Sequence, residues 1–369
     1  MRNLIFVILI LLALVFAVFS LFRKKPKKSV KWLCAVGGLL AAFILGYVWY
    51  SPSWSFPVTT GEFQVETTYD TFIDERRLET YEDDGSHRWL NVAFWYPDDE
   101  TLSDRSCPLV VFSHGSFGSK ESNETQYREL ASQGYVVCAI DHTYQCLGTV
   151  GPDGQYTGID GSFQSQIIQA GDDTKEQREQ LHSLFKEWMA VRTADISFVI
   201  DTIIAQADTE PKDSVYHIVD TSRIGVMGHS LGGAAALGIG RMRSDISAVI
   251  SLEAPFMCDV TGIKDGEFVW EDAPYPVPVL NVYTDSSWHI LSSSPQYAQN
   301  SAMQRDDRSD TQDIHISGAG HMSLTDLVYS RPPLCLFFGQ NMFFDVGGYE
   351  QTINKAYVAF LDKYLKKTA

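Results

Sequence analysis

With 369 residues, the chain is long enough for one large domain with an appendage or for two modest domains. Its formal charge of −17 is unevenly distributed. Residues 1–50 hold seven of the 29 Lys and Arg residues and none of the 46 Asp and Glu residues, which leaves −24 on the remainder. Because so acidic a body repels a phosphate backbone, we expect no nucleic-acid partner.

Two apolar segments open the chain. Residues 3–22 are almost wholly apolar and residues 32–50 carry no charge, so each is long enough to cross the roughly 30 Å hydrocarbon layer as a helix. A cleavable signal peptide fits poorly, because only Arg2 precedes the first segment and the basic stretch 23–28 follows it. Short basic loops stay in the cytoplasm. The sequence therefore predicts a transmembrane helical hairpin over residues 1–50, with the rest of the chain on the extracytoplasmic side.

A linker rich in Pro, Ser and Thr follows at residues 51–61, and strand-like and helix-like patterns alternate over residues 62–369. This alternation predicts an α/β fold, with a mostly parallel central sheet and helices on both faces. The polar, glycine-rich stretch 143–173 is predicted to be an elaborate loop. We expect strands at 90–96, 108–112, 135–140, 223–227, 248–252, 277–283 and 313–317, and helices at 121–133, 231–239 and 351–365, with a long helix from about residue 174.

The six cysteines form no CxxC pair and no metal-ligand spacing. Cys34 lies in the second apolar segment, and the other five are an odd number, which does not indicate a disulfide framework. Cys138 lies within a predicted strand and is expected to be a small core residue. We therefore predict no metal site, no cofactor and no cysteine nucleophile.

The pentapeptide Gly228-His229-Ser230-Leu231-Gly232 matches the pattern G-x-S-x-G. It follows an apolar strand and precedes a helix of small residues, as the tight strand–turn–helix of a nucleophilic serine requires. That turn exposes the serine oxygen and directs the helix N-terminus toward a developing oxyanion. The pattern predicts Ser230 as the nucleophile of a hydrolase.

A serine hydroxyl needs a base, and in this type of fold the order along the chain is serine, acid, histidine. Three histidines follow Ser230, and His321 is the best candidate because it comes after Gly320 on a loop beyond the last predicted strand. His315 alternates within that strand and is expected to face the core or solvent. His289 is held in reserve.

Two carboxylates end strands between the serine and the histidine, Glu253 and Asp285. Either could orient the imidazole and stabilise its cation, and their spacing alone does not choose between them. One oxyanion N–H is expected from Leu231, and the second from Ser116 or Phe117.

The chain resembles the platelet-activating factor acetylhydrolases of the plasma and intracellular type II kind over about residues 108–327. The motifs that carry this resemblance are Phe112-Ser113-His114-Gly115, Ile140-Asp141-His142, the helix with Arg192 and Asp195, Gly228–Gly233, Leu252-Glu253-Ala254 and Gly318–His321. It implies calcium-independent hydrolysis of short or oxidised acyl chains at the second position of phospholipids. It also implies Ser116 as the oxyanion donor.

The same resemblance favours Glu253 over Asp285 as the acid, although the family has an aspartate at that position. The longer side chain of glutamate keeps Asp285 as an alternative. The two N-terminal spans are a further departure and suggest a membrane-anchored bacterial relative. A serine peptidase or amidase on the same fold, and a catalytically silent membrane-anchored scaffold, remain alternative functions.

Four other features have more than one interpretation. Arg192 and Asp195 lie one helical turn apart and are expected to form an ion pair on the helix surface or to anchor a loop. His142 either lines the acyl pocket or has a structural role, and His114 is expected to hold its loop by a hydrogen bond rather than act as an acid or base. The apolar stretch 331–344 is expected to pack on the core rather than form a lipid-facing lip of the site.

Overall fold

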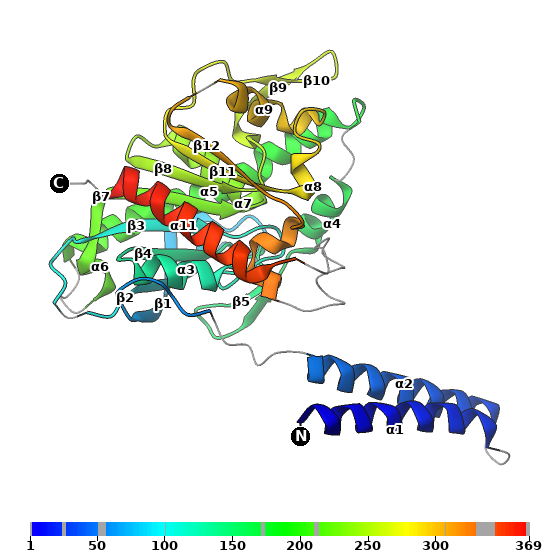
Figure 1. Cartoon of the computed structure of the whole chain (residues 1–369). Helices are drawn as coiled ribbons and strands as arrows, with labels where there is room; N and C mark the ends of the chain where they lie inside the picture. The colour runs from blue at the N-terminus through cyan, green and yellow to red at the C-terminus, as the bar shows by residue number, and fades with distance from the viewer. Residues whose placement is uncertain are drawn as a thin grey trace. The chain divides into compact units, whose positions relative to one another are not determined.

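The computed structural model of the chain describes residues 2–23, 27–50, 57–99, 101–170, 174–209, 214–306, 308–329 and 344–366. The described residues form two compact units, one up to Pro57 and the other from Val58 onward, and Figure 1 colours both along the chain.

The first unit is a pair of helices, α1 (Arg2–Phe22) and α2 (Lys28–Tyr50). Small residues form their contact: Ala17 and Ala35 are buried, and a Cβ on Gly38 would lie 2.9 Å from the Ala17 Cβ. Among the described residues, the segment Lys28–Gly46 is long and apolar enough to cross a membrane, whereas the described apolar stretch of α1, Ile8–Phe22, is shorter. The helical parts of the expected hairpin are present, but only one of them qualifies as a span by length and composition.

The second unit is built on an eight-stranded sheet of order β1-β2-β4-β3-β7-β8-β11-β12. β1 and β2 pair antiparallel with each other and β2 pairs antiparallel with β4, whereas the pairs from β4 through β12 are parallel. The predicted mostly parallel sheet is confirmed. The strands are β1 (Val65–Leu78), β2 (His87–Pro97), β3 (Cys107–Ser113), β4 (Val136–Asp141), β7 (Val219–His229), β8 (Ile246–Leu252), β11 (Val279–Thr284) and β12 (Thr311–Ile316).

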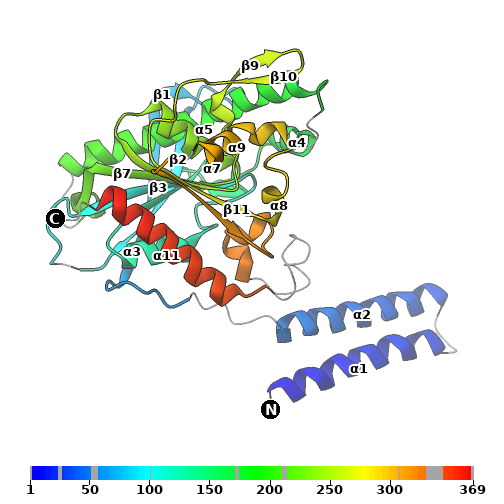
Figure 2. The same ribbon diagram turned by 45° about the horizontal axis from the view of Figure 1, so that its top comes forward.

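Helices cover both faces of this sheet (Figure 2). On β3, Val110 and Phe112 pack in one core with α3 (Glu124–Ser132) and α11 (Val346–Leu365). Leu109 and Val111 pack in the other core with α5 (Arg178–Thr209) and α7 (Leu231–Met242). Because successive side chains of a strand point to opposite faces, a continuous apolar run fills both cores.

Shorter elements lie on the connections. The stretch 143–173, predicted to be a loop, contains a small hairpin and a helix. The strand β1 and a second small hairpin, formed by β9 and β10, were not predicted from the sequence. These elements are β5 (Gly148–Val150), β6 (Tyr156–Gly158), α4 (Gly161–Gln169), α6 (Val215–Ile218), β9 (Val260–Lys264), β10 (Glu267–Trp270), α8 (Asp285–Trp288), α9 (Ala298–Arg305), and the 3₁₀ turns η1 (Met257–Asp259), η2 (Pro295–Tyr297), η3 (His321–Leu324) and η4 (Asp326–Tyr329).

The outcome for the apolar stretch and for the cysteines depends on which residues the structure describes. Apart from Phe344, the apolar stretch 331–344 lies outside the described residues. The five described cysteines are free, and Cys138 is buried in the core as predicted.

Candidate active site

Ser230 occupies a tight turn between β7 and α7. Its backbone has φ 53° and ψ −122°, a conformation that L-residues rarely adopt, and its N–H donates to the Leu252 carbonyl at 2.8 Å. Glycines permit the turn, because a Cβ on Gly228 would lie 2.3 Å from the Gly232 oxygen and a Cβ on Gly232 would lie 2.0 Å from the Ser113 oxygen. This is the strained strand–turn–helix that the G-x-S-x-G pattern predicts.

Glu253 lies directly after β8 and is almost completely buried, with 2% of its surface exposed. It also has a left-handed backbone, with φ 53°. Its Oε2 accepts a hydrogen bond from the Thr284 N–H at 2.8 Å, whereas Oε1 has no partner among the described residues. A buried carboxylate oxygen that receives no hydrogen bond lowers the stability of the fold, because it has lost its contacts with water. This oxygen is therefore available to a donor such as an imidazolium.

His321 begins η3 beyond β12, on the loop where the sequence places the base. Its N–H donates to the Ser286 Oγ at 2.9 Å, and its carbonyl accepts from His229 Nε2 at 3.1 Å. Its ring centroid lies 4.7 Å from that of His229, the residue before Ser230. Burial lowers the pKa of the His321 imidazole, and the negative charge of Glu253 partly offsets this.

Asp285, the alternative acid, has other partners. Its Oδ1 lies 2.7 Å from His315 Nε2, and its Oδ2 accepts from the Gly318 N–H at 2.8 Å. Burial raises its pKa, but these hydrogen bonds outweigh that effect and leave the pKa below its usual value. His289, the reserve base, is 69% exposed in its side chain and lies 3.8 Å from the same carboxylate. Asp285 thus contacts His315, whereas Glu253 acts on the His321 imidazole through its charge, without a hydrogen bond between the two side chains.

The two predicted oxyanion donors lie on neighbouring backbone segments, since a Cβ on Gly115 would lie 3.3 Å from the Ser230 Cβ. Leu231 is the first residue of α7, and Ser116 follows β3 in a loop where Phe117 has φ 61°. Within the described residues, neither the Ser116 nor the Leu231 N–H has a hydrogen-bond acceptor. Free N–H groups at these positions are what an oxyanion site requires.

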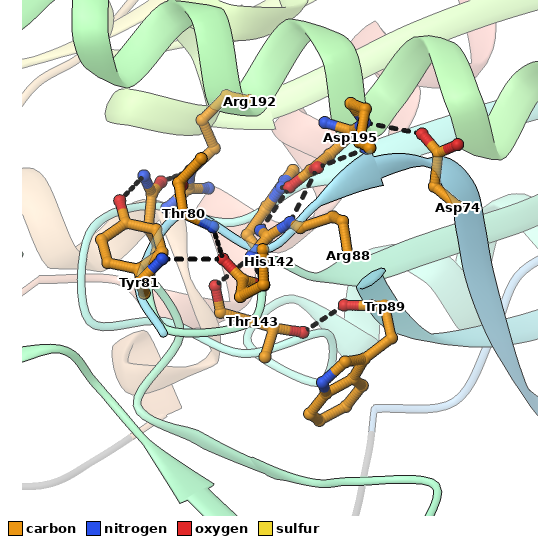
Figure 3. A network of polar contacts seen from close by, with 12 residues as sticks. Asp74, Thr80, Tyr81, Arg88, Trp89, His142, Thr143, Arg192 and Asp195 are labelled. Carbon is orange, nitrogen blue, oxygen red and sulfur yellow. Dashed lines mark hydrogen bonds and ion pairs between the residues drawn. The ribbon is translucent and has the colours of Figure 1, made fainter. Parts of the chain in front are cut away.

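The predicted ion pair between Arg192 and Asp195 is not formed. Both side chains have no exposed surface, and no hydrogen bond joins them. Asp195 instead bonds to Arg88, Arg77 and His142, at distances of 2.7 to 3.1 Å. Figure 3 shows Asp195, Arg88 and His142 of this network. A second carboxylate, that of Glu79, accepts a hydrogen bond from Arg88 Nη1 at 2.9 Å.

Arg88 and Glu79 were not predicted from the sequence. An arginine within the apolar strand His87–Pro97 was the available signal, because a charge among buried positions needs a buried partner. His142 is fully buried: Nε2 bonds to Ser113 Oγ at 2.8 Å and Nδ1 to Asp195 at 2.9 Å. Burial lowers its pKa to about 3. Because both ring nitrogens have buried protein partners, the contacts favour the structural one of its two predicted roles.

The described residues contain no group of three or more His, Cys, Asp or Glu side chains that could hold a metal ion. What they do contain is a strained serine, a half-buried histidine and a buried carboxylate, each at the C-terminal end of a parallel strand.

The family model of the platelet-activating factor acetylhydrolases, isoform II, matches residues 98–369, which include all of these groups. The chain belongs to this family. It is 26% identical to the platelet-activating factor acetylhydrolase of Gallus gallus over 280 residues, which are 70% of this chain and 62% of that protein. A probable 1-alkyl-2-acetylglycerophosphocholine esterase of Arthroderma benhamiae is 25% identical over 54% of this chain and 46% of its own length. The chain thus matches less than two thirds of the length of these family members.

The fold has a solved counterpart. A ferulic acid esterase from Streptomyces cinnamoneus superposes with a TM-score of 0.61 over 85% of this chain and 93% of that one. At 20% identity, this likeness establishes an α/β-hydrolase-like fold for the family member described here.

Proposed function

We propose that this chain is a serine ester hydrolase that acts on phospholipid-like substrates with a short or oxidised acyl group. The observation that carries the proposal is the strained backbone of Ser230 between β7 and α7, because such a turn serves to expose a nucleophilic oxygen. Family membership supports the substrate class, since curated relatives carry the names of acetylhydrolases and of a glycerophosphocholine esterase.

In the proposed mechanism the Ser230 Oγ attacks the ester carbonyl carbon while His321 accepts the hydroxyl proton. The bond from carbon to the alcohol oxygen then breaks, and His321 returns the proton to the leaving alcohol. A water molecule attacks the acyl-enzyme in the same way, releases the carboxylic acid and restores Ser230.

Glu253 is the proposed acid of this triad. Support comes from its unpartnered Oε1 and from its charge, which acts on the His321 imidazole. Asp285 is the weaker candidate because His315 and the Gly318 N–H already occupy its two oxygens. The Ser116 and Leu231 N–H groups are the proposed donors to the oxyanion, since both lack acceptors within the described residues.

The two N-terminal helices are proposed to be a membrane-spanning hairpin. Their contact is made of small residues, while large apolar side chains such as Leu12 and Val15 point outward and are more than half exposed. This arrangement suits lipid, in which close backbone approach stabilises helix pairs. The basic stretch 23–28 would stay in the cytoplasm, leaving the hydrolase domain on the other side.

Substitution of the nucleophile tests the proposal. Ser230→Ala is expected to abolish turnover of acetyl esters, and the variant should keep the unfolding temperature of the unaltered chain. Rates for a series of acyl-chain lengths, with and without phospholipid vesicles, define the substrate class, and aminoacyl amides serve as the competing substrates. Full esterase activity in Ser230→Ala would refute the serine mechanism, and faster cleavage of amides would refute the esterase assignment.

A further inference from the structure

The peptide unit that links Gly115 to Ser116 is held from its carbonyl side. The Gly115 carbonyl accepts two hydrogen bonds, from His114 Nδ1 at 2.6 Å and from the Gly118 N–H at 3.1 Å. A trans peptide is planar, so its C=O and N–H point in opposite directions. Fixing the Gly115 carbonyl therefore fixes the direction of the Ser116 N–H.

The contacts of His114 determine which of its nitrogens carries the proton. Its ring has no exposed surface, and its Nε2 accepts the backbone N–H of His142 at 3.3 Å. The proton must then be on Nδ1, which faces the Gly115 carbonyl. Burial, the positive charge of Arg192 and the neighbouring His142 hold the pKa of His114 well below its ordinary value. The neutral imidazole thus donates through Nδ1 and accepts through Nε2.

A second clamp holds the preceding peptide unit. Nη1 of the fully buried Arg192 donates to the His114 carbonyl at 2.6 Å, and Nε donates to Gln145 Oε1 at 2.6 Å. On the other side the N-terminus of α7 approaches so closely that a Cβ on Gly232 would lie 2.5 Å from the His114 oxygen. The loop is fixed between α5 and α7.

The loop needs this support because its own conformation is unfavourable. Phe117 has φ 61°, which costs a non-glycine residue on the order of 1 kcal/mol or more. The strain lies one residue beyond the Gly115–Ser116 peptide unit, so a relaxed Phe117 would lose the turn that brings the Gly118 N–H to the Gly115 carbonyl. Without its donors the Gly115 carbonyl is free to rotate, and a rotated peptide unit would direct a carbonyl oxygen, rather than an N–H, toward the carbonyl oxygen of a bound ester.

We infer that His114 is a positioning residue for the oxyanion site: its Nδ1–H holds the Gly115 carbonyl so that the Ser116 N–H points at the developing oxyanion. The inference rests on the proposed ester hydrolysis and extends it to a residue that does not touch the substrate. His114 acts through the orientation of one peptide unit and takes no part in proton transfer.

A matched pair of variants of the full-length chain isolates the donor. His114→Asn keeps an N–H₂ group near the place of Nδ1, whereas His114→Leu has the same branching without a donor. Both variants lose the acceptor for the His142 N–H, so this loss is common to the pair. We expect kcat for an acetyl ester to fall by about a hundredfold in His114→Leu, with KM little changed, and by less than about tenfold in His114→Asn.

A thionoester substrate separates orientation from general damage. Its developing charge sits on sulfur, a weaker acceptor, so an oxyanion donor accelerates the oxygen ester more than the thionoester. The ratio of the two rates should fall in His114→Leu and be largely kept in His114→Asn. Equal loss of kcat in both variants with an unchanged rate ratio would overturn the inference.

A measurement on the unaltered chain reports the tautomer of His114 itself. Imidazole ¹⁵N resonances, assigned by comparison with His114→Asn, should show His114 with its proton on Nδ1 over the working pH range. A proton on Nε2 would overturn the inference. Failure of the esterase proposal is distinguishable, because it would appear as no ester turnover by the unaltered chain or as full turnover by Ser230→Ala.

Discussion

At the scale of single residues, the two carboxylates that could serve His321 differ in what their oxygens contact. Glu253 keeps one buried oxygen without a partner among the described residues, whereas both oxygens of Asp285 are hydrogen-bonded. The sequence could place both acids at strand ends, but it could not choose between them. The choice depends on which side chains fold onto each carboxylate, and spacing along the chain does not contain that information.

Substitution of each acid is expected to separate them. Glu253→Gln should lower kcat on the order of a thousandfold or more, because a neutral amide no longer stabilises the imidazolium. Asp285→Asn should stay within about tenfold of the unaltered chain, because it disturbs only the contacts to His315 and Gly318. Steady-state kinetics of the two variants give the comparison, and a loss confined to Asp285→Asn would reverse the assignment.

The pH dependence of turnover follows from the environment of His321. The base acts in its neutral form, so kcat/KM should rise with pH through the pKa of His321 and then level off. Burial places that pKa below the ordinary histidine value, and the Glu253 charge partly raises it. Residual activity in Glu253→Gln should therefore have its acid limb at lower pH than the unaltered chain. A limb that moves to higher pH would contradict the pairing of Glu253 with His321.

At the scale of elements, apolar runs made the parallel strands predictable. β3 and β4 are buried along their whole length, and such runs are typical of parallel strands covered on both faces. β1 was missed because it is an edge strand dominated by polar and charged residues, without the regular alternation of polar and apolar residues that marks a strand. The stretch 143–173 gives no strand pattern in the sequence because its hairpin strands have only three residues each.

The close packing of α7 on the loop after β3 can be tested with one methyl group. Gly232→Ala would place a Cβ 2.0 Å from the Ser113 oxygen, so the helix or the loop must shift. We expect a destabilisation of about 1–3 kcal/mol and a loss of ester turnover. Gly161→Ala in α4 is the control, because a Cβ there meets no atom within 4 Å. Equal unfolding temperatures for the two variants would show that the contact is not close.

At the scale of the whole molecule, the chain joins a domain of the acetylhydrolase family to an apolar helix pair. The family match begins at residue 98, so it does not include α1 and α2. Their apolar composition was readable from the sequence, but the sequence did not establish that both cross a membrane. Among the described residues, only the segment Lys28–Gly46 has the length and composition of a membrane-spanning helix.

Extraction and protection experiments test the proposed hairpin. The full chain should stay with the membrane after alkaline carbonate treatment, because two spans bury far more apolar surface than a surface contact does. Protease added from the extracytoplasmic side should digest the hydrolase domain and an N-terminal tag together. Release by carbonate, or protection of only one terminus, would contradict two spans.

The site of covalent labelling shows whether Ser230 is the residue that attacks the ester. The full chain is treated with a fluorophosphonate and the modified peptide is located by mass spectrometry. We expect a single adduct on Ser230 that is absent from Ser230→Ala and forms much more slowly in His321→Ala. An adduct on another serine, or equal labelling of Ser230→Ala, would contradict it.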